Sequence, residues 1–210
     1  MPDTNTPEML NDLLGSVQVF SSAMREVLEE KLLRETARGR LTFSRLKLLK
    51  LVAFTDSHTI GEVAAFLGVS NTAASKAVDK LVRRRLLRRT EAHADRRASE
   101  LSLTGEGRRL LSAYEAARDK KLTEIFSTSV PEQLSETAAR LDRLTANIVD
   151  HTANPQDLCL QCGIYFREKC RLRELVPRTC FYQKHKARKA AESGVEGAGG
   201  TEAQVQPPAS

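Results

Sequence analysis

The chain has 210 residues, of which 40% are hydrophobic and 29% are charged, and its formal net charge is +6. This composition provides enough apolar side chains for a folded core and excludes a chain that is disordered throughout. No apolar run approaches the roughly 18 residues of a membrane span, and the N-terminus lacks a signal-peptide pattern. We therefore expect a cytoplasmic protein without a membrane partner.

The first predicted element is a long amphipathic helix. After a flexible N-terminus at residues 1–9, apolar residues recur at steps of three and four, which predicts this helix within residues 10–37. A second helix is expected from about Phe43, with Leu46 and Leu49 on one face. Both helices precede the part of the chain in which the local signals are strongest.

Residues 59–85 predict two short helices joined by a sharp turn. Thr59 and Glu62 have the spacing of a capping box at the start of the first helix. Gly68 permits the left-handed conformation that ends this helix, and Ser70 is a natural N-cap for the next one. A helix-turn-helix needs such a turn, because its first helix supports the second, whose N-terminal residues enter the major groove of DNA.

A small β hairpin and two long helices follow. Residues 86–90 and 98–103 are strand-like runs, and the polar residues 91–97 between them predict the tip of a hairpin. The helical period then returns over residues 104–125 and 131–148. The expected fold class is mainly α with a small β-wing: a winged helix-turn-helix with long helices on both sides.

Positive charge is concentrated in two blocks. Residues 38–110 carry 16 Lys/Arg against 7 Asp/Glu, and residues 156–189 carry 9 against 3. The remaining segments are net acidic. Clustered Lys and Arg gain affinity for polyanions by displacing counterions from phosphates, so both blocks indicate surfaces that face a polyanion.

The helix-turn-helix pattern specifies which residues would contact double-stranded DNA. Small polar side chains at the start of the second helix can meet base edges, and lysines farther along suit phosphates. Arginines of the hairpin can lie over the neighbouring minor groove, whose negative potential attracts them. The expected DNA-binding residues are Ser70, Asn71, Thr72, Ser75, Lys76, Lys80, Arg88, Arg89, Arg96 and Arg97. For arginines 83–89, a solvated helix end that complements the helix dipole is the alternative interpretation.

Together these motifs resemble the MarR family of winged helix-turn-helix transcriptional regulators over residues 40–150. The matching stretches are Leu67-Gly68-Val69-Ser70, Val78-Asp79-Lys80-Leu81, Asp95-Arg96-Arg97 and Leu101-Ser102-Leu103-Thr104-Gly105-Glu106-Gly107. The resemblance implies a homodimer that binds a pseudo-palindromic operator, with the first helix and the last two helices forming the dimer interface. Apolar stripes in these helices also require a partner surface, although packing within one chain is the alternative. Such a protein is expected in a bacterial-type cytoplasm, associated with the nucleoid.

One position departs from the family pattern. Arg85 stands where such proteins commonly have Gly, immediately before the apolar pair that enters the first wing strand. We therefore expect the end of the second helix to be less sharply turned than in the family. An additional phosphate contact from Arg85 is the alternative.

Four cysteines occupy a C-terminal segment that the resemblance does not cover. Cys159, Cys162, Cys170 and Cys180 have the spacing C-x2-C-x7-C-x9-C. In a reducing compartment such a cluster is typical of a metal or redox site, and we predict all four as metal ligands. Nearby basic residues, Arg167 among them, would offset the charge of the thiolates, and Tyr165, Phe166, Phe181 and Tyr182 would shelter the site. His185 could replace a cysteine as a ligand, but it lies in a basic run, so a solvated side chain is expected.

The identity of the cofactor is open between an iron–sulfur cluster and zinc. Zinc sites often use two close pairs of cysteines, and only one such pair is present, so the spacing slightly favours the cluster. Reduced structural cysteines and a reversible disulfide switch are further alternatives.

The sequence thus predicts a MarR-type regulator that is gated by its cysteine cluster. We expect no enzymatic activity, because the sequence holds neither a Gly-rich phosphate loop nor a His-Glu metalloprotease motif. One alternative is a regulator with a structural zinc clip and an unidentified small-molecule effector. Another is an iron–sulfur redox protein that uses the winged unit only as a scaffold.

The predicted organisation has six parts in chain order. They are a flexible N-terminus (1–9), an N-terminal dimerisation helix (10–37), a winged helix-turn-helix DNA-binding domain (38–104), C-terminal dimerisation helices (105–153), a Cys-rich metal or redox module (154–188) and a disordered tail (189–210). The tail is expected to be disordered because it is rich in Gly, Ala, Glu, Gln and Pro.

Overall fold

The computed structural model describes residues 6–39, 41–54, 59–91, 99–149, 158–159, 162–176 and 178–196. The chain forms two compact units, Met1–Leu134 and Ser135–Ser210. The first unit contains the helix-turn-helix and the wing, and the second contains most of α7 and the cysteine segment. Helices dominate both units, and the wing is a small two-stranded sheet, which confirms the predicted fold class.

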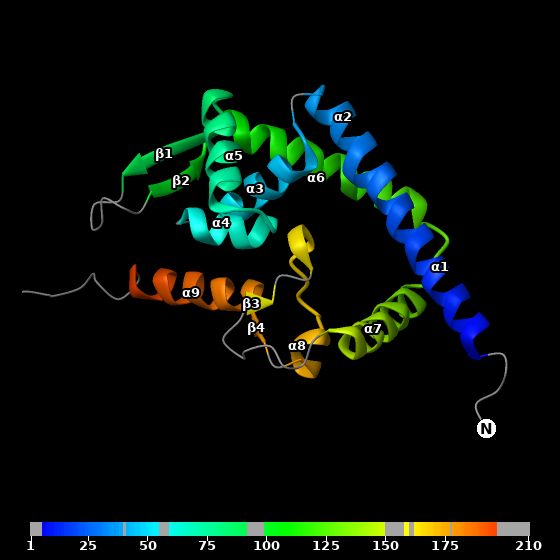
Figure 1. Cartoon of the computed structure of the whole chain (residues 1–210). Coiled ribbons are helices and arrows are strands. Elements are labelled where there is room, and N and C mark those ends of the chain that lie inside the picture. Colours follow the sequence, from blue (N-terminus) through cyan, green and yellow to red (C-terminus); the bar gives the residue numbers. More distant parts are fainter. Residues whose placement is uncertain are drawn as a thin grey trace, which may run out of the picture. The chain divides into compact units, whose positions relative to one another are not determined.

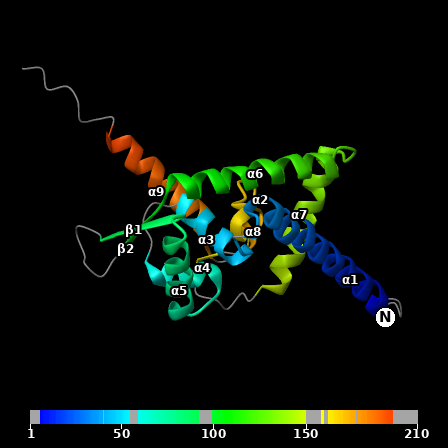
Figure 2. The ribbon, with the colours of Figure 1, turned by 90° about the horizontal axis from the view of Figure 1, so that it is seen from above.

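A long helical rod begins the first unit (Figure 1). It consists of α1 (Thr6–Met24), the π-helical segment η1 (Arg25–Lys31) and α2 (Leu32–Ala37), so the helix expected within residues 10–37 is present. Most of α1 is exposed in the single chain, whereas Leu28 and Leu33 are buried. Figure 2 shows α2 beside α6 (Gly105–Ile125), against which it packs.

Three short helices form the centre of the first unit. They are α3 (Phe43–Phe54), α4 (Ile60–Leu67) and α5 (Asn71–Arg83). The capping box of α4 is present as predicted: the Thr59 side chain accepts from the Glu62 amide, and the Thr59 amide donates to the Glu62 carboxylate at 2.9 Å. Gly68, at φ 66°, ends α4 in the left-handed conformation. The two helices then bury apolar side chains, Val63 and Val78 among them, in their shared core.

The hairpin that follows α5 is antiparallel. β1 (Leu87–Glu91) pairs with β2 (Ser99–Leu103) in a register that places Leu87 opposite Leu103. Leu87 and Leu101 are buried, whereas Arg88 and Arg89 are exposed. The predicted hairpin is therefore confirmed, and its tip at residues 92–98 lies outside the described residues.

Two buried polar contacts attach α6 to the rest of the first unit. The Tyr114 hydroxyl donates to the backbone carbonyl of Leu28 at 3.1 Å, and burial raises the pKa of Tyr114 to about 12. The Lys50 ammonium lies 3.0 Å from the Glu115 carboxylate, and burial lowers the pKa of Lys50. These contacts fix α6 against η1 and α3, so the helix provides a stable base for the wing.

The second unit is built from short elements around α7. These are α7 (Pro131–Ile148), β3 (Leu158–Cys159), η2 (Gly163–Tyr165), α8 (Leu172–Leu175), β4 (Thr179–Cys180) and α9 (Phe181–Glu196). Its core includes Ala146, Leu172 and Val176. The disordered tail predicted for residues 189–210 is wrong for residues 189–196, which belong to α9, because the Lys, Ala and Glu residues there favour a helix.

No helix in the described part of the chain is long and apolar enough to cross a membrane.

Candidate functional site

Helix α5 presents one buried face and one polar face. The Ser70 side chain caps the helix by accepting from the Ala73 amide at 3.3 Å. Ala74, Val78 and Leu81 are fully buried, which orients the helix. The predicted contact residues Asn71, Thr72, Lys76 and Lys80 are exposed, and Ser75 is half-buried. The structure therefore brings the predicted residues of this helix to one side, where they form a candidate DNA-reading surface.

The wing is anchored to α6 by a threonine and a glycine. The Thr104 hydroxyl donates to the Arg85 carbonyl at 2.6 Å, and its oxygen caps α6 by accepting from the Gly107 amide at 3.0 Å. A Cβ atom at Gly107 would lie 2.1 Å from the Leu86 carbonyl oxygen, so only glycine permits this approach. The Leu101-to-Gly107 motif thus has a structural function: it fixes the start of β1 against the start of α6.

The turn between α5 and β1 corrects one expectation. Arg85 adopts φ 56°, in the left-handed region, and its amide donates to the Val82 carbonyl at 2.8 Å. The chain therefore turns sharply after α5 although it lacks the glycine, and the prediction of a less sharply turned helix end is wrong. The Arg85 side chain is exposed. A non-glycine residue in this region carries backbone strain.

The basic residues of the wing extend the same candidate surface only in part. Arg88 and Arg89 are exposed on β1, and Arg89 lies 4.0 Å from Asp79 of α5. This is a surface contact between the wing and α5. Arg96 and Arg97 lie outside the described residues, so their contribution stays a prediction.

The geometry in the first unit is that of a winged helix-turn-helix: a capped reading helix, a sharp turn before it and an anchored antiparallel wing. A sequence profile described as "MarR family" matches residues 41–98. The chain therefore contains a winged helix-turn-helix domain of the MarR family. The match covers the helix-turn-helix and the first strand of the wing.

Individual relatives agree with this assignment. The chain is 24% identical to the HTH-type transcriptional repressor MdtR of Bacillus subtilis over 128 residues, which cover 61% of this chain and 83% of that protein. A crystal structure of a MarR family transcription regulator aligns with a TM-score of 0.59 at 21% identity, covering 70% of this chain and 97% of that one. A MarR family regulator from Rhodococcus sp. RHA1 aligns with a TM-score of 0.51 at 24% identity, covering 64% and 94%. These structural similarities establish the fold.

In the second unit, the four cysteines surround one cavity. Strands β3 and β4 are parallel and place Cys159 beside Cys180 in register. Cys162 precedes η2, and Cys170 lies just before α8. All four line a cavity of about 150 Å³, here named the cysteine cavity, and all four are free thiols. Among the described residues, no three His, Cys, Asp or Glu side chains are grouped so that they could hold one metal ion.

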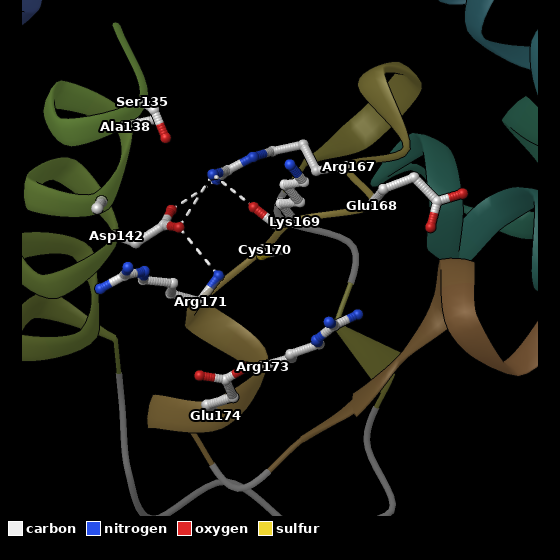
Figure 3. Close-up of a pocket in the computed structure, with 11 residues that line it drawn as sticks. Ser135, Ala138, Asp142, Arg167, Glu168, Lys169, Cys170, Arg171, Arg173 and Glu174 are labelled. Carbon is white, nitrogen blue, oxygen red and sulfur yellow. Dashed lines mark hydrogen bonds and ion pairs between the residues drawn. The ribbon is translucent and has the colours of Figure 1, made fainter. Parts of the chain in front are cut away.

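A buried carboxylate connects the cysteine cavity to α7 (Figure 3). Asp142 is only 4% exposed and accepts two hydrogen bonds from the Arg167 guanidinium, at 2.5 and 2.9 Å. It also accepts from the Arg171 amide at 3.1 Å. The hydrogen bond to Asp142 raises the pKa of Arg167, and the nearby sulfurs of Cys170 and Cys162 contribute in the same direction. Asp142 and Arg167 both line the cysteine cavity.

A second cavity has a volume of about 680 Å³. Residues of α7 line it together with the segment that carries Cys170 (Figure 3). Asp142, Arg167, Cys170 and Arg173 line both cavities. Cys170 thus borders the larger space as well as the cysteine cavity.

The surroundings of the cysteines differ in part from expectation. Ala146, Leu172 and Val176 pack against Cys159 and Cys170, so the shelter there is aliphatic. Of the predicted aromatic shell, Phe181 is buried, Phe166 stacks on Tyr182 at 5.9 Å, and Tyr165 is 42% exposed. His185 was expected to be solvated, which is wrong: it is 5% exposed and its ring lies 4.3 Å from the Phe181 ring.

A polar cluster joins the Cys170 segment to α9. The Tyr182 hydroxyl donates to the Glu168 carboxylate, and the Lys186 ammonium lies 2.6 Å from the same carboxylate. The contact with Lys186 lowers the pKa of Glu168, and the hydrogen bond to Glu168 raises the pKa of Tyr182. With Asp142, this cluster holds the segment 166–171 from two sides.

Asp142 is a residue of the candidate site that the sequence reasoning missed. It stands four residues after Ala138 and four before Ala146, both of which lie on the sheltered side of α7. The sequence did contain a signal for this residue: an acidic side chain on the apolar face of a helix, where a buried carboxylate requires a partner. Its partner, Arg167, was assigned only as one of several counter-charges.

Proposed function

We propose that this protein is a sequence-specific transcriptional regulator that binds double-stranded DNA as a homodimer. The observation that carries the proposal is α5, whose cap and buried face leave Asn71, Thr72 and Lys76 exposed on one side. Side chains in this position of a recognition helix read base edges and contact phosphates. The family match of residues 41–98 supports the same function.

Exposed apolar side chains support the homodimer. Helix α1 exposes Leu10, Leu14 and Phe20 by 52%, 58% and 53%, and α7 exposes Ile148 by 77%. Contiguous apolar surface on a single chain marks an interaction site. Operators with two-fold symmetry require a two-fold symmetric reader, so a second copy of this chain is the partner we propose for these helices.

The cysteine segment is proposed as the gate of this regulator. Its ligand would be an iron–sulfur cluster or zinc on Cys159, Cys162, Cys170 and Cys180. Asp142 supports the proposal. It lies on α7, which we propose for the dimer interface, and it accepts hydrogen bonds from Arg167 and Arg171 on either side of the proposed ligand Cys170. A change at the cysteines would alter these contacts and so the spacing of the two reading helices on DNA.

Operator selection from random duplexes, followed by affinity measurements at several salt concentrations, tests DNA binding. We expect one enriched pseudo-palindrome and an affinity that falls linearly on a logarithmic salt scale. Lys76→Ala should weaken all sequences alike and reduce the salt slope by about 1, whereas Asn71→Ala should relax the preference at one base position. Lys121→Ala is the control, because Lys121 lies on α6 and pairs with Glu124 at 3.3 Å. Failure to enrich any sequence would contradict the proposal.

A second candidate mechanism is regulation by a small molecule, with zinc as a structural clip. A cavity of about 450 Å³ in the first unit supports it, because the apolar side chains of Val52, Leu103 and Leu111 line it together with the charged Arg108 and Glu115. An effector with an apolar body and a carboxylate would suit this lining. It would be favoured if removal of the metal left operator affinity unchanged while such a compound changed it.

A further inference from the structure

The arrangement of the four sulfur ligands distinguishes between the two cofactors of the proposed gate. Tetrahedral zinc holds its thiolates about 2.3 Å from one point, so four zinc ligands converge on a space no larger than a single ion. The cysteines here line a cavity of about 150 Å³ instead. Within the described ranges, no group of three His, Cys, Asp or Glu side chains could hold one metal ion. The cavity that the four cysteines line is large enough for a body of several atoms.

Strand pairing and hydrogen bonds position the ligands around the cysteine cavity. The parallel pairing of β3 with β4 fixes Cys159 beside Cys180. Cys162 precedes η2, and Cys170 lies in the segment 166–171, which Asp142 and the Glu168 cluster contact. These hydrogen bonds fix the segment that carries Cys170.

The environment of the cysteine cavity also suits a sulfide-containing cluster. Ala146, Leu172 and Val176 pack against Cys159 and Cys170, and an apolar shell limits the access of water. Arg167 lines the cavity and supplies positive charge against the thiolates, in an orientation that Asp142 fixes.

We infer that the cysteine cavity holds an iron–sulfur cluster ligated by Cys159, Cys162, Cys170 and Cys180, with Arg167 as its fixed counter-charge. This inference rests on the proposed function only in taking the cysteines as the ligands of its gate. Asp142 is a positioning residue: it contacts Arg167 and the Arg171 amide and does not ligate the cluster.

The test is metal and sulfide analysis of the full chain purified without oxygen, together with its visible absorption spectrum. We expect a brown protein that contains iron and inorganic sulfide in equal amounts. A protein purified without metal should recover the same spectrum from ferrous iron and sulfide under reducing conditions. A colourless chain with about one zinc and no sulfide would overturn the inference, and so would a chain that takes up neither iron nor sulfide.

Two variants connect the cluster to the assigned residues. Cys170→Ser should lose the visible absorption, whereas Ser135→Ala, which lines only the larger cavity, should keep it. Arg167→Gln should keep the iron-to-sulfide ratio but lower the reduction potential, because a positive charge near the cluster is lost. A reduction potential that is unchanged in Arg167→Gln would contradict the role of Arg167 as the counter-charge of the cluster. Should Cys170→Ser not fold, the analysis of the unmodified chain still decides the question.

DNA binding of the same samples separates this inference from the proposed function. A zinc-containing chain that binds its operator would overturn only the cluster. A chain with an iron–sulfur cluster that binds no DNA would overturn only the regulator.

Discussion

The two units of this protein are held in shape by different means. In the first unit, the elements are fixed by backbone geometry at helix ends: the capping box at Thr59, the left-handed Gly68 and the Thr104 cap. In the second unit, side chains that are distant in sequence carry the arrangement, above all Asp142 with Arg167. Helix-end geometry therefore positions α4, α5 and the wing in the first unit, where the buried Lys50 pairs with Glu115 of α6, whereas a buried ion pair holds the Cys170 segment in the second.

Substitution of Gly107 should have the largest effect on stability. Gly107→Ala places a Cβ atom 2.1 Å from the Leu86 carbonyl oxygen, so the wing must move away from α6. We expect the free energy of unfolding to fall by about 3 kcal/mol or more, as for other backbone clashes in a core. Chemical denaturation followed by circular dichroism measures it.

Gly105→Ala is the matched control. Its added Cβ atom would meet only the Arg109 side chain at 3.9 Å, an ordinary contact. Stability should therefore stay within about 1 kcal/mol of the original chain. Equal losses from both alanines would refute the role assigned to the contact with Leu86.

The next largest effect should come from Asp142→Asn. The substitution removes the charge that Arg167 and the Arg171 amide satisfy, so the second unit should lose about 2 kcal/mol of stability. Glu136→Gln on the same helix is the control, because its pair with Arg140 is exposed and such pairs contribute about 0–1 kcal/mol. Comparable losses from the two variants would contradict the difference drawn between buried and surface charges.

Tyr114 provides a prediction for alkaline pH. Its pKa in the folded chain is about 12, above the ordinary 10.0, so the folded state holds the proton more tightly. The corresponding stability is complete below pH 10.0 and is lost as the pH rises towards 12. Tyr114→Phe should cost about 1 kcal/mol at neutral pH through the lost hydrogen bond and should flatten the alkaline decline. Tyr165→Phe, at an exposed site, should change neither; a decline that persists unaltered in Tyr114→Phe would exclude Tyr114 as its source.

Arg85 should give the smallest change. At φ 56° an L side chain costs about 1 kcal/mol, and glycine would remove this cost while it gains freedom in the unfolded chain. Arg85→Gly should therefore raise the free energy of unfolding by less than about 1 kcal/mol, whereas Arg85→Val should lower it. Thermal denaturation of the two variants side by side measures the difference, and a more stable valine variant would be inconsistent with the left-handed turn.

These comparisons also explain what could be predicted from the sequence. Thr59, Gly68 and Ser70 act within a few residues of themselves, so their spacing alone predicted the helix ends correctly. The prediction from Arg85 of a less sharply turned helix end was wrong, because the hydrogen bonds around Thr104 impose a turn that an arginine does not itself favour. Asp142 and the buried His185 could not be placed, since their surroundings come from segments that only the fold brings together. The spacing of the cysteines indicated a site, but the size of their cavity required the structure.

The most direct test of the central claim is the operator affinity of the anaerobically purified full chain, measured before and after its metal content is removed. If the cysteine cavity gates DNA binding, the dissociation constant should change by about tenfold or more and should return when the cofactor is restored. Cys170→Ser should show one affinity under both conditions. An affinity of the unmodified chain that is the same with and without its cofactor would contradict the claim.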